Sequence, residues 1–132
     1  MAKRTVNKNV KSKKTLKVTD KGAIYVQATF NNTIVTVTDR TGNTICWGSC
    51  GGSGFKGARK STPFAATTAI EKVLRQAADL GVREVDVFIK GPGAGRDSAL
   101  RVLKSIGMTI NKIADITPIP HNGCRPKKTR RV

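Results

Sequence analysis

The chain has 132 residues, the length of one domain with a single hydrophobic core. Its 25 lysines and arginines outnumber its 8 aspartates and glutamates, which gives a net charge of +17 at pH 7. Self-repulsion of this size favours a polyanionic partner, above all nucleic acid. The N-terminus lacks the apolar run of a secretory signal and no stretch approaches a membrane span, so we expect neither export nor membrane insertion.

The positive charge is concentrated at the two ends of the chain. Residues 1–17 and 118–132 contain many lysines and arginines and no carboxylate, whereas the middle is nearly balanced. Such ends cannot fold alone and have no apolar face for a membrane, so we expect arms that become ordered on nucleic acid. The predicted organisation is a basic N-terminal arm, a single α/β domain and a basic C-terminal tail, over residues 1–20, 21–117 and 118–132.

The first part of the domain has the pattern of an antiparallel meander. Alternating or β-branched residues predict three strands, at residues 23–30, 33–39 and 44–49. Asn31 and Asn32 separate the first two strands, and asparagine tolerates the left-handed backbone of a tight hairpin. A second turn is predicted at residues 40–43. The apolar face of the first strand is predicted to consist of Ile24, Val26, Ala28 and Phe30.

A helical period follows. Thr62 and Pro63 are typical of a helix start, with threonine as the cap, and Gly81 is typical of the end. The buried face of this helix is predicted to contain Ala66, Ile70, Val73, Leu74 and Ala77. A strand, a helix and a last strand are then predicted at residues 84–90, 96–106 and 108–116. The order β-β-β-α-β-α-β predicts a mixed five-stranded sheet with packed helices, in which the strands joined through helices run parallel.

Two glycine-rich segments are candidate phosphate contacts. Gly91, Gly93 and Gly95 join a strand to a helix start, where free N–H groups and the helix dipole favour an anion, with Arg96 at the mouth. The alternative is a tight turn that needs glycine only for its dihedral angles. Residues 51–60 combine four glycines with Lys56, Arg59, Lys60 and Phe55, a ring that could stack on a base. The alternative there is a solvated loop with Phe55 in the core.

Metal binding and catalysis have little support. Cys46, Cys50, His121 and Cys124 could be combined into a zinc site, but their spacings are poor, and three cysteines without an export signal indicate reduced thiols in a cytosol-like compartment. A metal-dependent nuclease needs a carboxylate cluster. Asp86 and Glu71 could contribute to one, but the first strand offers no acid, so ordinary surface charges are favoured. A DNA-compacting architectural protein is the other alternative.

Four long segments resemble a known family, small ribosomal subunit protein eleven in its bacterial or organellar form. They are NNTIVTVTD at 31–39, GGSGFKGARKSTPFAA at 51–66, GPGAGRDSALRVLKSIG at 91–107 and ITPIPHNGCRPKKTRRV at 116–132. The likeness runs from about Ala23 to the end, whereas the N-terminal arm matches only in being basic. Cys46 and Cys50 stand where family members commonly have small residues, and Thr129 interrupts a basic run that is usually continuous.

The resemblance implies a ribonuclease-H-like fold without catalysis and a structural role in translation. It implies binding to small-subunit rRNA on the platform, bridging of rRNA helices, and a place lining the Shine–Dalgarno cleft at the messenger exit. The implied neighbours are ribosomal proteins seven and eighteen, initiation factor three and the mRNA leader, in cytoplasmic or organellar ribosomes. No cofactor, metal, membrane or small-molecule substrate is implied. The expected rRNA-binding residues are Asn31, Asn32, Phe55, Lys56, Arg59, Lys60, Gly91, Gly93, Gly95, Arg96, Arg101, Lys104, His121, Asn122, Arg125, Lys127, Lys128, Arg130 and Arg131.

Overall fold

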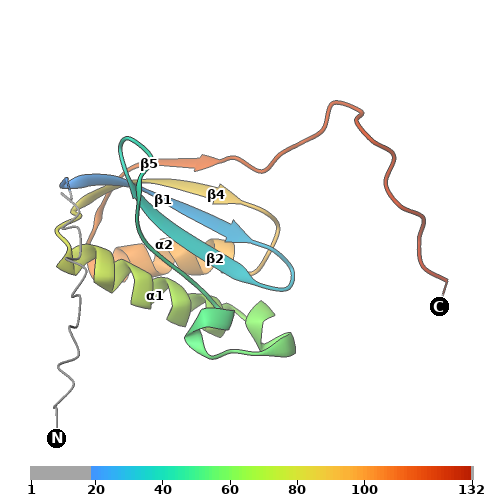
Figure 1. Ribbon diagram of the computed structural model, residues 1–132, viewed down its shortest axis with the longest axis horizontal. Coiled ribbons are helices and arrows are strands. Elements are labelled where there is room, and N and C mark those ends of the chain that lie inside the picture. Colours follow the sequence, from blue (N-terminus) through green and yellow to red (C-terminus); the bar gives the residue numbers. More distant parts are fainter. Residues whose placement is uncertain (1–18, 132) are drawn as a thin grey trace, which may run out of the picture.

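The computed structural model describes residues 19–131, so the predicted basic cluster at residues 1–17 lies outside the described residues. The elements follow the predicted order and are shown in Figure 1. They are β1 (Lys21–Ala28), β2 (Thr33–Asp39), β3 (Thr44–Ser49), the 3-10 helices η1 (Gly51–Ser53) and η2 (Gly57–Ser61), α1 (Pro63–Asp79), β4 (Glu84–Lys90), α2 (Gly95–Ile106) and β5 (Thr109–Asp115).

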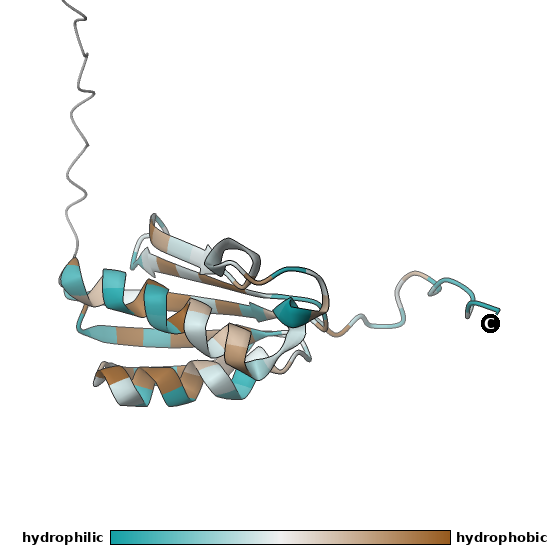
Figure 2. Cartoon of the chain, turned by 90° about the horizontal axis from the view of Figure 1, so that it is seen from below, coloured by the Kyte–Doolittle hydropathy of each residue, from teal (hydrophilic) through white to brown (hydrophobic). Residues whose placement is uncertain are grey.

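The strands form one mixed sheet in the order β3-β2-β1-β4-β5. The meander β1–β2–β3 is antiparallel, whereas β1 pairs parallel with β4 and β4 parallel with β5. This confirms the predicted α/β fold with a five-stranded mixed sheet. Both helices pack on the same face of the sheet, α1 over β2 and β3 and α2 over β1, so the opposite face is left open (Figures 1 and 2).

The core lies between the sheet and the two helices. Alternate residues of β1 face the helices, and Ile24 and Val26 are opposite Val37 and Val35 of β2. The predicted apolar face of α1 is confirmed, since its five residues are all buried. The cap is also confirmed, because the Thr62 hydroxyl accepts a hydrogen bond from the Ala65 N–H at 3.3 Å.

The prediction was wrong at the first hairpin. β1 ends at Ala28, and Phe30, expected to be buried, is 75% exposed in a four-residue turn. Neither Asn31 nor Asn32 has a left-handed backbone. Among residues 19–131, Asn122 is the one non-glycine residue with positive φ. The Thr29 N–H donates to the Asn32 carbonyl at 2.9 Å, and the Thr29 hydroxyl accepts from the Asn32 N–H. Thr29 therefore closes a turn over residues 29–32, whereas the sequence predicted a tight hairpin at Asn31 and Asn32 alone.

Replacing Ile70 by alanine should lower the free energy of unfolding by about 2–5 kcal/mol, because the side chain is fully buried and its loss leaves a cavity. Urea unfolding followed by circular dichroism measures this change. The matched control is Ile119→Ala, since that side chain is 81% exposed in the tail and should change stability little. Equal effects of the two substitutions would contradict the position of the core.

Candidate nucleic-acid interface

The C-terminal tail leaves the sheet as an extended, exposed segment. After β5 the Ile116 N–H still donates to the Ile89 carbonyl at 2.9 Å, but Pro118 and Pro120 have no N–H with which to continue the ladder. From residue 118 to residue 131 every residue is exposed and none lies in a helix or strand. Figure 1 shows the tail running away from the domain.

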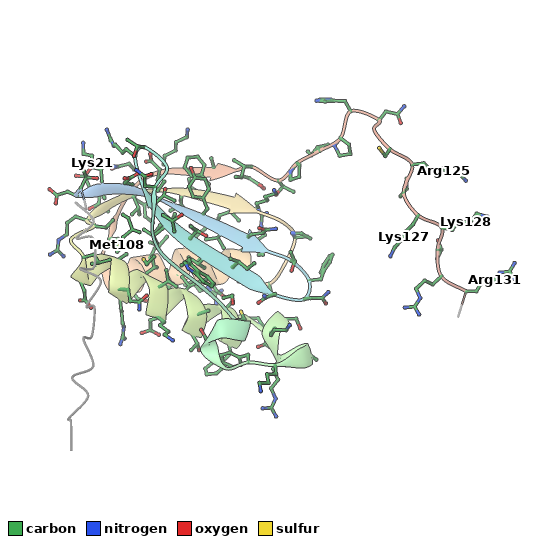
Figure 3. The ribbon with its side chains drawn as sticks, viewed as in Figure 1. Lys21, Met108, Arg125, Lys127, Lys128 and Arg131 are labelled. Atoms are coloured by element: carbon green, nitrogen blue, oxygen red, sulfur yellow. The ribbon has the colours of Figure 1, made fainter. Side chains whose placement is uncertain are left out.

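The tail presents cations that nothing in the described chain neutralises. These tail cations are Arg125, Lys127, Lys128, Arg130 and Arg131. None of them takes part in an ion pair within residues 19–131, and those labelled in Figure 3 project on different sides of the backbone. At about 3.4 Å per extended residue, they span roughly 20 Å. His121 and Asn122, also predicted to bind RNA, are exposed at the start of this segment.

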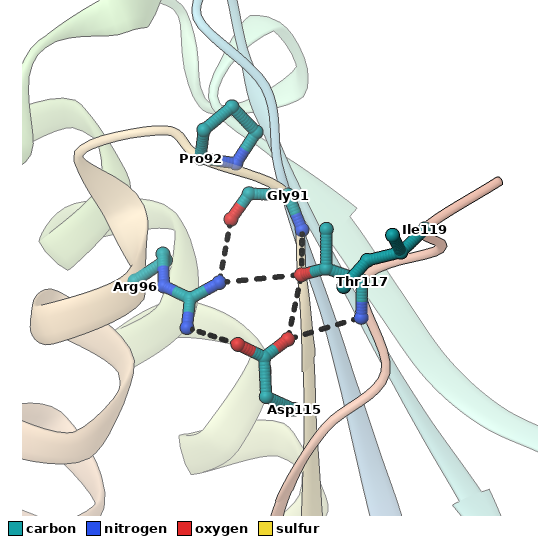
Figure 4. Close-up of a pocket in the computed structure, with 6 residues that line it drawn as sticks. All are labelled: Gly91, Pro92, Arg96, Asp115, Thr117 and Ile119. Carbon is teal, nitrogen blue, oxygen red and sulfur yellow. Dashed lines mark hydrogen bonds and ion pairs between the residues drawn. The ribbon is translucent and has the colours of Figure 1, made fainter. Parts of the chain in front are cut away.

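A hydrogen-bonded cluster fixes the point at which the tail begins. The Arg96 guanidinium pairs with the Asp115 carboxylate at 2.7 Å and donates to the Gly91 carbonyl at 2.7 Å. Thr117 joins the cluster, because its hydroxyl donates to Asp115 at 2.6 Å and accepts from the Gly91 N–H at 3.1 Å. Figure 4 shows these bonds around a hollow of about 650 Å³. The cluster therefore ties the start of α2, the end of β4 and the first tail residues together.

The electrostatics of this cluster depend on an ionised carboxylate. The hydrogen bond from Arg96, followed by those from Thr117, holds the pKa of Asp115 well below its usual range. Arg96 is thus engaged within the protein. The sequence places Arg96 at the mouth of a candidate anion site, and the partner that it has in the structure is 19 residues away in the chain.

The glycines of the loop at residues 91–95 allow a close approach to the protein's own backbone. A Cβ at Gly91 would lie 2.3 Å from the Ala28 carbonyl oxygen, and one at Gly93 would lie 2.3 Å from the Thr29 carbonyl oxygen. The Gly93 N–H donates to the Ala28 carbonyl at 2.8 Å, and the Gly91 N–H is bonded to Thr117. The expectation of free N–H groups was therefore wrong for these two residues. Their lack of a side chain lets the loop pack against Ala28 and Thr29.

The glycine-rich segment at residues 51–61 contains the 3-10 helices η1 and η2. Lys56 and Arg59 are exposed and Lys60 is half-buried. Phe55 packs against the core and meets the Phe64 ring edge to face, with ring centroids 5.9 Å apart. The alternative of a core-facing Phe55 is therefore the one the structure supports.

Several of these segments meet at one end of the sheet, which we call the hairpin end. It comprises the β1–β2 turn (residues 29–32), the loop at residues 91–95, η1 with η2, and the exit of the tail. Gly95 contacts Thr33, the Cys50 N–H donates to the Thr33 carbonyl at 3.1 Å, and the Ser98 hydroxyl donates to the Pro63 carbonyl at 3.3 Å. Asn31 is exposed in the turn and Asn32 is half-buried. Arg101 and Lys104 are exposed farther along α2, away from this end.

Sequence reasoning missed the exposed aromatic residues near these segments. Phe64 is 72% exposed, Phe30 is 75% exposed and Trp47 is 67% exposed. Phe64 directly follows the proline at the helix start and lies outside the predicted apolar face of the helix. That position could have indicated that its ring is exposed. Phe30 was assigned to the core because the alternating pattern continues past the real end of β1.

The alternative chemistries have no assembled site in the described residues. Asp86 points to the open face of the sheet, whereas Glu71 pairs with Arg75 on α1, which covers the other face. Cys46 donates to the Val73 carbonyl at 3.6 Å, and burial raises the pKa of its thiol. Residues 19–131 contain no group of three or more potential metal ligands. Among the same residues, no helix has both the length and the apolar character needed to cross a bilayer.

Comparison with known proteins gives one consistent result. A family profile described as Ribosomal protein S11 matches residues 22–131. The chain is 58% identical over 131 residues to "Small ribosomal subunit protein uS11" of Borreliella burgdorferi (strain ZS7), covering 99% of this chain and 98% of the relative. It is 60% identical over 126 residues to the protein of that name from Hydrogenovibrio crunogenus, covering 96% and 97%. It is 56% identical over 126 residues to "Small ribosomal subunit protein uS11c" of Chaetosphaeridium globosum, covering 96% and 97%.

Replacing Asp115 by asparagine should destabilise the chain in a pH-dependent way. The folded pKa is depressed, so the stabilisation by this carboxylate is complete above about pH 4 and is lost as the pH falls. We expect the wild-type chain to exceed Asp115→Asn in free energy of unfolding at pH 7, and the difference to shrink towards about pH 2. Urea unfolding at each pH measures it. Asp79→Asn removes an exposed carboxylate outside the cluster and is the control. A difference independent of pH would refute the ionic role of Asp115.

Proposed function

Because the chain belongs to the ribosomal protein S11 family, we propose that its hairpin end and its tail bind small-subunit rRNA. Membership makes it a structural protein of the small ribosomal subunit that acts in translation, and not an enzyme. A place in that subunit implies contact with rRNA and with other ribosomal proteins. The remaining question is which surfaces of this chain make which contact.

The observation that carries the proposal is the tail. Five cations lie on an exposed, extended segment without a carboxylate, and this segment starts from a rigid cluster. An extended backbone with side chains on all sides can enter a narrow space between RNA helices and meet phosphates on each side of it. Contacts of this kind position a protein and carry little sequence information, so recognition rests on the shape of the folded RNA.

The hairpin end supplies the second part of the interface. Lys56, Arg59 and Lys60 lie in the segment before α1, and Phe64 exposes its ring in the first turn of α1, a combination suited to a phosphate backbone with an unstacked base. Asn31 offers an amide at the tip of the turn. Arg96 and the glycines at 91, 93 and 95 serve binding by fixing the direction of the tail, and Arg101 with Lys104 extends the cationic surface along α2.

The family resemblance supports a proposal for the location within the subunit. We place the chain on the platform, where it bridges rRNA helices and lines the Shine–Dalgarno cleft at the messenger exit. Ribosomal proteins seven and eighteen are the proposed neighbours, with initiation factor three and the mRNA leader as passing partners. Bridging is supported by the tail, which extends away from the cations of the hairpin end, so that each can hold a different RNA helix.

The affinity for rRNA should fall steeply with salt. If about eight phosphates are contacted, log affinity should decrease with log salt at a slope of about −6, and replacing the five tail cations by glutamine should reduce its magnitude by about 3.5. Filter binding to a platform rRNA fragment between 50 and about 300 mM salt measures the slope. The double variant Lys72→Gln, Arg83→Gln removes exposed cations elsewhere and should leave it unchanged. A slope near zero in the wild-type chain would refute the electrostatic account.

Deleting residues 121–132 should leave the domain folded but prevent stable incorporation into the small subunit. The described tail residues bury nothing in the domain, so the melting temperature should change little, whereas the cations that hold the RNA are lost. Reconstitution followed by sedimentation in high salt measures incorporation. A truncated chain that co-sediments as fully as the wild type would contradict the role of the tail.

A further inference from the structure

The open face of the sheet carries an aromatic row that no described element covers. Tyr25 on β1 stacks on Phe88 of β4, with ring centroids 5.1 Å apart and planes 16° apart. The same row continues in register through Thr36 of β2 to Trp47 of β3. Tyr25 is 41% exposed and Trp47 is 67% exposed. An exposed aromatic row of this extent on a small protein indicates a contact surface.

The geometry around the Phe88 ring does not suit base stacking on that ring. β4 lies between β1 and β5, so one face of Phe88 is against Tyr25 while the ammonium of Lys112, on β5, lies 5.6 Å from its centroid. Both faces of Phe88 are therefore occupied within the protein. A nucleic acid base needs a free ring face, whereas an apolar side chain of a protein can pack against ring edges.

The charges on this face also differ from those at the hairpin end. Three of the chain's eight carboxylates lie on the open face or beside it, at Asp39, Glu84 and Asp86. They alternate with cations: Glu84 is 3.9 Å from the Lys21 ammonium, and Asp86 is opposite Lys112 in register. A mosaic of both signs around aromatic residues is typical of protein interfaces, whereas carboxylates repel an RNA backbone.

A hollow of about 330 Å³ lies at one end of the aromatic row. Tyr25 and Phe88 of the row line it, together with Asp39, Asp86 and Arg40. Asp39 is held in its turn by Thr41, whose hydroxyl donates at 2.8 Å, and by Asn43; these bonds lower its pKa. The carboxylate is thus fixed and ionised, and it is set beside aromatic walls.

We propose that the open sheet face docks a segment of another protein, which packs apolar side chains on the Tyr25–Phe88 row and places a basic side chain in the hollow at Asp86. This rests on the proposed function, because the partner is met within the small subunit. Aromatic walls and a carboxylate together suit an arginine or lysine, whose stem is apolar and whose head is cationic. The hairpin end and the tail bind RNA, and this face binds protein.

The test uses photo-cross-linking in assembled small subunits. The full chain with p-benzoylphenylalanine in place of Tyr25 is incorporated, irradiated and analysed by mass spectrometry. We expect cross-links to a segment of a neighbouring protein that contains lysine or arginine. Cross-links to rRNA, cross-links to residues 1–18 of the same chain, or no cross-link would each overturn the proposal.

The same probe in place of Ile119 keeps this inference separate from the proposed function. At that tail position we expect cross-links to rRNA, because the side chain is 81% exposed beside the tail cations. If the Ile119 probe reaches rRNA while the Tyr25 probe reaches no protein, only the docking inference fails. If the Ile119 probe reaches no rRNA, the proposed function of the tail fails.

Charge reversal tests the hollow itself. Adding Asp86→Lys to the probe-bearing chain should lower the protein cross-link yield by roughly tenfold, because like charges then face each other. Asp79→Lys makes the same change at an exposed position on α1 and should leave the yield unaltered. Melting temperature and incorporation into the subunit show that both variants are folded. An equal yield from the two variants would overturn the assignment of a basic side chain to this hollow.

Discussion

The contact between the loop at residues 91–95 and the β1–β2 turn is the constraint on which the hairpin end depends. It is possible only because three glycines lack a Cβ that would lie within 2.4 Å of Ala28, Thr29 or Thr33 atoms. The contact fixes the start of α2, and with it the position from which Arg96 reaches Asp115. The direction of the tail is therefore set by backbone packing inside the domain, before any RNA is met.

Most of the fold could be predicted because its signals are local. Alternation gave β2, β3 and β4 their bounds, and Thr62 with Pro63 gave the start of α1. The first turn could not be predicted correctly, since Thr29, whose hydroxyl closes the turn, looked like an ordinary strand residue. Because the bonds of Thr29 end β1 at Ala28, Phe30 lies in the turn and is exposed, and its side chain does not reach the core.

The candidate site was harder to predict because its partners are distant in sequence. The glycines at 91, 93 and 95 allow a close approach, but the groups that approach are the Ala28 and Thr29 carbonyls and the Thr33 side chain. Glycine is required both where a ligand approaches the backbone and where another part of the protein does, so the sequence looks the same in the two cases. Asp115 became the partner of Arg96 only through the parallel pairing of β4 with β5 and the crossover between them.

The parallel pairing of β1, β4 and β5 also separates the first residues of the sheet from the start of the tail. The chain enters β1 at Lys21 and leaves β5 after Asp115, and these points lie at opposite ends of the sheet because the strands run the same way. Strands of seven or eight residues at about 3.3 Å per residue keep them roughly 25 Å apart. The sheet therefore separates the start of the cation-rich tail from the first residues of β1 by its full length. The open sheet face lies between those points, and its mixed charge suits the protein partner that we propose for it more than a phosphate backbone.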